Sequence, residues 1–151
     1  MTTATQPGQP GLFAEERTFT ETATAGVYTA EVPIPKGAYV IDVIFRNTVV
    51  WNAASSASAV IGDSEDANGY LEATDVKTAP VADTLGATRG ASAAHSLLAS
   101  IGAYKGGARK YYAAADTITA TITTTGATGD TGRSRMLVMY VMPNIIAATK
   151  A

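Results

Sequence analysis

Alternation of apolar and polar side chains is the dominant pattern along this chain. Residues 18–24 carry threonine at every second position, and residues 117–123 repeat this arrangement with apolar residues between the threonines. Successive side chains of a β-strand point to opposite faces of a sheet, so a period of two predicts strands with one uncharged polar face. Threonine also favours strands, because its β-branched side chain suits a pleated, half-exposed surface.

Further strands are predicted by the same alternation, bounded by glycine, proline and asparagine. They lie at residues 27–34, 39–45, 48–51, 57–62, 70–76 and 135–142. In segment 39–45 the alternation places odd-numbered side chains on one face and even-numbered ones on the other. Both faces are mostly apolar, which is typical of a strand that is covered on both sides.

About eight to ten short strands without alternating helices favour two antiparallel layers. We predict an all-β fold, an antiparallel β-sandwich with a jelly-roll-like strand order. Residues 1–12 are rich in Gln, Pro and Gly, which predicts an extended, flexible N-terminal arm. Residues 13–151 are predicted to form a single β-sandwich domain with a short C-terminal tail. Within it, residues 77–95 suit a long loop, and the apolar spacing of residues 94–101 is compatible with a short helix.

The last predicted strand suggests contact with other molecules. Almost every residue from 136 to 142 is apolar, so this strand offers no polar face to water and needs cover on both sides. The tail that follows adds Ile145 and Ile146, which it is too short to bury by itself. We therefore predict oligomer or capsid contacts at Met136, Val138, Tyr140, Met142, Ile145, Ile146, Leu12 and Phe13.

Charge and composition exclude several classes of partner and chemistry. The net charge of −2 and the pI near 5.3 give no basic field for nucleic acid or an anionic membrane surface. The longest apolar run is far shorter than the ~20 residues that span a bilayer. With no cysteines, the chain has no disulfides, thiolate nucleophile or cysteine-based zinc site. The N-terminus lacks the features of a signal peptide, so we expect an uncleaved arm.

Candidate catalytic residues are few and isolated. The single histidine, His95, lies among alanines and serines with no carboxylate near it in sequence, and a solvated loop residue is the favoured interpretation. Ser134 and the serines of the 55–58 segment lack the glycine-flanked elbow of a hydrolase nucleophile. We assign no catalytic residue, no cofactor and no metal ligand, and we expect that the chain is not an enzyme.

The acidic segment 63–69 is the densest group of oxygen ligands. It contains Asp63, Glu65, Asp66, Asn68 and Gly69. In the register of an EF-hand loop the first position would be Ser64 and the twelfth Asp75, where a bidentate Glu is needed. We favour a structural β-turn closed by Asn68 and Gly69, with a calcium site as the open alternative.

Two other patterns have a functional and a plain interpretation. Lys105, Arg109 and Lys110 precede Tyr111 and Tyr112, an interleaving that occurs in nucleic-acid sites, but three charges in an acidic chain favour a solvated hairpin turn. The threonine ladder of residues 117–123 has the spacing of an ice-binding face. Such faces stack many equivalent strands, and this sequence has no repeat, so an uncharged outer face is favoured.

Several segments together resemble small virion proteins of tailed bacteriophages. They are Val27–Gly37 (VYTAEVPIPKG), Ile41–Thr48 (IDVIFRNT), Val60–Tyr70 (VIGDSEDANGY), Asp116–Ile122 (DTITATI) and Gly132–Tyr140 (GRSRMLVMY). The pattern is most similar to that of capsid decoration, or cement, proteins. The resemblance implies a homotrimer on the outer capsid surface of the virion that bridges subunits of the major capsid protein, and synthesis in the host cytoplasm.

Two alternatives stay open beside the decoration protein. One is a head-fibre or tail component that adheres to host-surface glycans through Trp51, Tyr70 and the 126–132 loop. The other is a free carbohydrate-binding module. No motif of the resembling family identifies contact residues that transfer to this sequence.

Overall fold

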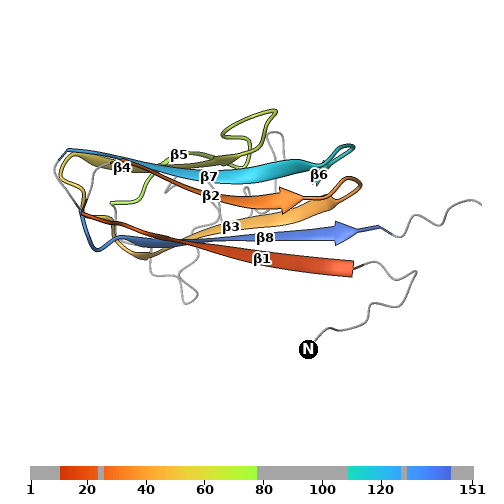
Figure 1. Ribbon diagram of the computed structural model, residues 1–151, viewed down its shortest axis with the longest axis horizontal. Coiled ribbons are helices and arrows are strands. Elements are labelled where there is room, and N and C mark those ends of the chain that lie inside the picture. Colours follow the sequence, from red (N-terminus) through yellow and green to blue (C-terminus); the bar gives the residue numbers. More distant parts are fainter. Residues whose placement is uncertain (1–10, 24–25, 78–108, 127–128, 144–151) are drawn as a thin grey trace, which may run out of the picture.

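The computed structural model describes residues 11–23, 26–77, 109–126 and 129–143 (Figure 1). Within these ranges the chain forms two four-stranded antiparallel sheets and no helix. Sheet A has the order β1-β8-β3-β6 and sheet B the order β2-β7-β4-β5. The strands are β1 (Gly11–Thr20), β2 (Val27–Ile34), β3 (Tyr39–Val49), β4 (Ser56–Gly62), β5 (Leu71–Asp75), β6 (Lys110–Tyr111), β7 (Asp116–Thr125) and β8 (Arg133–Met142). The predicted all-β antiparallel sandwich is confirmed.

Strand pairing is nested along the sequence. β1 pairs with β8, β2 with β7, β3 with β6, and β4 with β5. The pairs β8 with β3 and β7 with β4 then join these ribbons into the two sheets. In Figure 1, β2 and β7 run above β3, β8 and β1. The chain changes sheets at every connection except the one between β4 and β5. The nested pairing places the first and last strands, β1 and β8, side by side.

The hydrophobic core fills the space between the two sheets. Its residues come from the inward-facing positions of β2, β4 and β7 on one side and of β3 and β8 on the other. Small side chains on β4 and β7 allow the sheets to approach closely. The completely or almost completely buried members include Val32, Ile34, Val40, Trp51, Ala57, Ala59, Ile61, Ile118, Ala120, Ile122, Met136 and Val138.

Several predicted boundaries were wrong. Gly11 and Leu12, assigned to the arm, belong to β1, which ends at Thr20 and does not continue to Thr24. The strands predicted at residues 39–45 and 48–51 merge into one continuous strand, β3, which ends at Val49 and leaves Val50 and Trp51 outside it. Its second half stays in the sheet because it pairs with β8 as far as Arg133. Residues 1–10, the predicted loop and helix between residues 78 and 108, and the tail from residue 144 lie outside the described residues.

The predicted faces of segment 39–45 also need correction. Val40, Val43 and Phe45 face the core, although the alternation placed Val40 opposite the other two. The cause is an irregularity in the pairing with β8 between Val40 and Asp42, which inserts one extra residue, Ile41. Such a bulge shifts the period by one, so that strict alternation fails beyond it.

Candidate interaction surfaces and buried polar clusters

The outer face of sheet B is coated with hydroxyl groups. On β7 the threonines alternate with Ile118, Ala120 and Ile122, which are buried in the core, so Thr119, Thr121 and Thr123 face outward. Their neighbours on β2 and β4 are mostly small or polar, and Glu31 is the only charged residue among the direct partners of these three threonines. Around β7 this face is therefore mostly uncharged, as the threonine ladder predicts.

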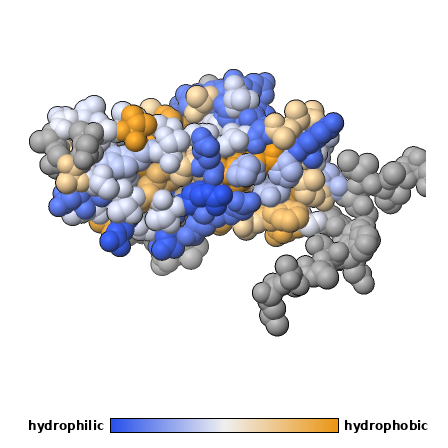
Figure 2. Space-filling view, viewed as in Figure 1, coloured by the Kyte–Doolittle hydropathy of each residue, from blue (hydrophilic) through white to orange (hydrophobic). Residues whose placement is uncertain are grey.

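The outer face of sheet A carries an apolar row across all four strands. Leu12, Val141, Tyr39 and Tyr111 are successive cross-strand partners, so their side chains lie on one face. Leu12 is 64% exposed, Tyr39 40% and Tyr111 46%, and the two tyrosine rings lie 4.8 Å apart. Figure 2 shows hydrophobic surface at the end of the sandwich where β1 begins and β8 ends. Exposed apolar side chains gathered in this way are typical of interaction surfaces.

The predicted contact residues of β8 all lie on the face of the strand that packs against the core. Met136 and Val138 are 0% exposed and belong to the core of this chain, so they have no surface for a partner. Tyr140 is buried beneath Phe13, whose ring stacks on it at 5.1 Å. Burial, with a smaller contribution from Glu15, also raises the pKa of Tyr140.

The outward residues of β8 are the odd-numbered ones, which the sequence analysis missed. Leu137, Met139 and Val141 are half-buried and lie on the same face as Leu12. The sequence signal that could have found them is the parity of Arg133 and Arg135, because residues an even number of positions from these charged side chains share their exposed face. Met142 packs partly against the core, and Ile145 and Ile146 lie outside the described residues.

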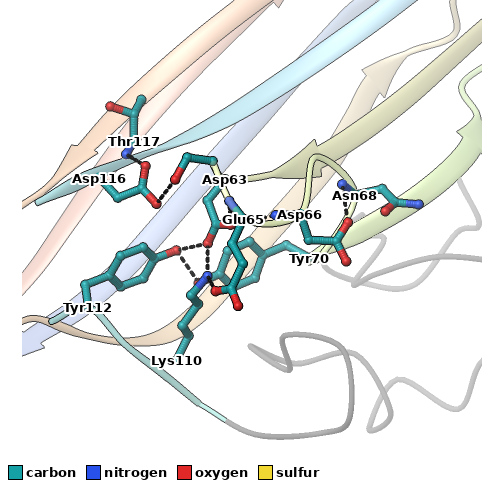
Figure 3. A network of polar contacts seen from close by, with 10 residues as sticks. Asp63, Glu65, Asp66, Asn68, Tyr70, Lys110, Tyr112, Asp116 and Thr117 are labelled. Carbon is teal, nitrogen blue, oxygen red and sulfur yellow. Dashed lines mark hydrogen bonds and ion pairs between the residues drawn. The ribbon is translucent and has the colours of Figure 1, made fainter. Parts of the chain in front are cut away.

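The acidic segment 63–69 forms a closed polar cluster with β6 (Figure 3). The buried carboxylate of Asp63 accepts hydrogen bonds from Lys110 Nζ at 2.6 Å and from Tyr112 Oη at 2.5 Å. Its other oxygen accepts the backbone N–H groups of Glu65 and Asp66. Lys110 also contacts Glu65 Oε2 at 2.8 Å. The carboxylates of this turn are therefore bound to partners within the chain.

Burial has two visible consequences in this cluster. The pKa of Tyr112 is raised strongly, first by burial and then by its hydrogen bonds to Asp63 and Tyr70. Gly62 must be glycine, because a Cβ atom there would lie 2.0 Å from the carbonyl oxygen of Asp66.

The interpretation of Lys110 as a solvated hairpin residue was wrong, since its side chain is only 13% exposed and binds two carboxylates. Lys105 lies outside the described residues.

A chelator is expected to change the melting temperature of this protein by no more than about 1–2 °C, because a cation that does not bind the native state adds no stability by linkage. The reason is that Lys110 and backbone amides occupy the oxygens of Asp63, and no group of three His, Cys, Asp or Glu side chains suited to a metal exists among the described residues. The measurement is thermal unfolding with and without EDTA, with added magnesium as the control. A large loss that calcium alone restores would contradict the structural interpretation.

A second buried polar cluster lies at the opposite end of the sandwich, around Glu21. Its carboxylate accepts three backbone N–H groups, from Asn52 at 2.9 Å, Ala53 at 3.0 Å and Gly132 at 3.0 Å. The side chain of Asn52 exchanges hydrogen bonds with Asp130 in the loop before β8. Glu21 therefore fixes the segment after β1 to the loops that follow β3 and β7.

Trp51 and Ser134 complete this end of the core. The indole N–H of Trp51 donates to Ser134 Oγ at 2.8 Å, and that hydroxyl donates to Asn47 Oδ1 at 2.9 Å. Trp51 is completely buried and Tyr70 is 7% exposed, so neither presents a ring to a glycan. The proposed glycan contacts at these two residues were wrong, because packing against Tyr28 and hydrogen bonding to Tyr112 hold the rings inside. His95 lies outside the described residues.

The strand arrangement places the chain among two-layered antiparallel β-sandwich proteins. No protein-family model and no curated protein matches the sequence. Among solved structures, the fold is similar to a chain in "Acidic stable capsid structure of Helicobacter pylori bacteriophage KHP30". The two chains are 18% identical, with a TM-score of 0.56 over 89% of this chain and 93% of the other. At this identity the likeness is one of fold. No helix among the described residues is long and apolar enough to cross a membrane.

Proposed function

We propose that this chain is a structural virion protein of a bacteriophage, bound to the capsid. The observation that supports this most strongly is the shared fold with a chain of a phage capsid structure, which extends over 89% of the sequence. The sequence resemblance to decoration proteins points independently in the same direction. The buried polar groups that could have served chemistry, at Glu21, Asp63 and Ser134, hold parts of the fold together, which supports a role without catalysis.

We further propose the finer assignment, a homotrimeric decoration protein on the outer capsid surface that bridges major capsid subunits. The apolar row of sheet A supports an interface there, since a soluble domain rarely leaves several large apolar side chains exposed together. The nested pairing of β1 with β8 and of β2 with β7 supports a jelly-roll strand order. In this proposal the protein is made in the host cytoplasm and added to the capsid.

The same proposal assigns different roles to the two ends of the chain. Ile145 and Ile146 follow β8 closely, and we assign them to contacts between copies. Residues 1–10 precede the exposed start of β1, and we assign them to the capsid. Repeated contacts in a symmetric oligomer would offset the entropy that binding of a Gln-, Pro- and Gly-rich segment costs.

Purified protein is expected to be a trimer by light scattering, with three times the 15.5 kDa mass of one chain. It should also bind saturably to capsids assembled without it. Changing Ile145 and Ile146 together to Asp should dissociate the trimer, because charges buried in a dry interface cost several kcal/mol. Deleting residues 1–10 is the matched control, which should keep the trimer and weaken capsid binding. A monomeric wild-type protein that leaves capsids bare would refute the proposal.

A further inference from the structure

Three arginines gather on the outer face of sheet A, beyond the apolar row. Arg46 on β3 lies directly opposite Arg135 on β8, and Arg133 follows on the same face of β8. All three are exposed. Glu16 pairs with one of them, since its Oε1 lies 3.4 Å from Arg135 Nη1. We call Arg46, Arg133 and Arg135 the arginine face.

The arrangement of the arginine face is unfavourable in an isolated chain. Like charges directly opposite each other on neighbouring strands destabilise a sheet. The protein is acidic overall, so these arginines do not serve a general excess of positive charge. Partner carboxylates would turn the repulsive pair into charge-assisted hydrogen bonds, which a guanidinium forms well because its planar fork matches a carboxylate. Half-buried Ile44 and Leu137 lie in the adjacent row and add apolar surface beside the charges.

An acidic edge of suitable character exists on the same chain, at β5. This strand is the last of sheet B, so one side of it has backbone groups that no described strand pairs. Glu72 and Asp75 on β5 are exposed. The ammonium group of nearby Lys77 binds the carbonyl oxygens of Ala53 and Ala54. We call Glu72 and Asp75 the β5 edge.

We propose that copies of this chain associate head to tail, with the arginine face of one copy against the β5 edge of the next. The inference rests on the oligomer of the proposed function and specifies its interface. A two-fold contact centred on the arginine face would bring the arginines of two copies together, which is repulsive. A contact between two different patches is heterologous, and it closes into a ring when its rotation permits. A trimer is such a ring.

Charge reversal tests this pairing. Arg46→Glu with Arg135→Glu, and separately Glu72→Arg with Asp75→Arg, should each raise the dissociation constant of the oligomer about 100-fold, since truncating or opposing a paired interfacial charge costs several kcal/mol. The measurement is analytical ultracentrifugation over a range of concentrations. The control is Glu31→Arg with Lys36→Glu, which reverses exposed charges outside both patches and should change nothing.

Rescue separates loss of pairing from loss of folding. The variant with all four reversals restores opposite signs across the contact and should recover the trimer. Mixing the two double variants should yield assemblies with an even number of chains, because each copy then accepts only the other kind. If the wild-type protein is trimeric and both double variants remain trimeric, the head-to-tail contact is refuted while the proposed function stands. If the wild-type protein is monomeric at every concentration, the oligomer itself fails.

Discussion

Replacing Glu21 with alanine should lower the free energy of unfolding by about 3–6 kcal/mol, because two buried backbone N–H groups and one partly buried one lose their acceptor and each unsatisfied group costs about 1–3 kcal/mol. These donors belong to Asn52, Ala53 and Gly132, in two loops far from Glu21 in sequence. Glu21 is 2% exposed, and its carboxylate is closely packed by the surrounding loops. A Cβ atom added at Gly129 would lie 2.0 Å from its Oε1 atom.

Urea unfolding followed by tryptophan fluorescence measures this loss, because Trp51 is the only tryptophan and packs beside the cluster. The melting temperature should fall by about 10 °C or more, at roughly 2–4 °C per kcal/mol for a domain of this size. Glu21→Gln should give an intermediate loss, since it keeps one carbonyl oxygen and places an amide donor against backbone donors. Glu31→Ala, on the exposed face of sheet B, is the control and should have almost no effect. Equal losses for Glu21→Ala and Glu31→Ala would show that the cluster contributes nothing special.

The fold class was predictable from the sequence because the sandwich has one buried and one exposed face on most of its strands. The alternation of Thr with Ile and Ala in residues 117–123 survives unchanged in β7, where Ile118 and Ile122 are completely buried. The β2 prediction at residues 27–34 matches the observed strand in full. The alternation of polar and apolar residues reflects the burial of one strand face directly, so these strands could be predicted without knowing the tertiary structure.

The predictions failed where a long-range contact decided the structure. The bulge at Ile41 depends on the register with β8, and nothing in the local sequence marks it. β1 contains Gly11, Glu15, Glu16 and Arg17, a poor strand by composition, and it forms because ten residues pair with β8. The same limit applies to function: Lys110 is close in sequence to other basic residues, and only the fold places it on Asp63, 47 residues away.

Four of the predicted contacts, Met136, Val138, Tyr140 and Met142, lie on the core face of β8, and the other four stay predictions. An apolar strand does need cover on both sides, and β8 has the core on one side. Arg133 and Arg135 mark the odd positions as exposed, whereas Ser134 suggests the even ones, and the burial of Ser134 against Trp51 and Asn47 decides between them. A serine in a strand is usually expected on the exposed face, but here hydrogen bonds to two buried side chains hold it in the core. The outward set is Leu137, Met139 and Val141.

Replacing Asp63 with alanine should lower the free energy of unfolding by about 3–5 kcal/mol, as expected when one partner of a buried ion pair is removed. The change leaves the ammonium of Lys110, the hydroxyl of Tyr112 and two turn amides without their acceptor. Tyr112→Phe should cost about 1–2 kcal/mol, since it removes hydrogen bonds to Asp63 and Tyr70 while keeping the ring. Tyr111→Phe is the matched control, because Tyr111 is exposed and the loss of its hydroxyl removes no buried hydrogen bond.

The double variant and a pH series decide whether the cluster acts as a unit. If Asp63 and Tyr112 are coupled, the combined loss of unfolding free energy should fall short of the sum of the single losses by about 1–2 kcal/mol.

The pKa of Tyr112 is raised in the folded protein, so folding favours its protonated form. Its contribution to stability is therefore complete below the usual tyrosine pKa of 10.0 and is lost progressively at higher pH, as the unfolded chain ionises. Unfolding measured from pH 8 to 11 should show a steeper alkaline loss for the wild-type protein than for Tyr112→Phe. Parallel curves, together with strictly additive losses, would mean that the hydroxyl of Tyr112 lies in contact with solvent and that the cluster does not fasten β6 to the acidic turn.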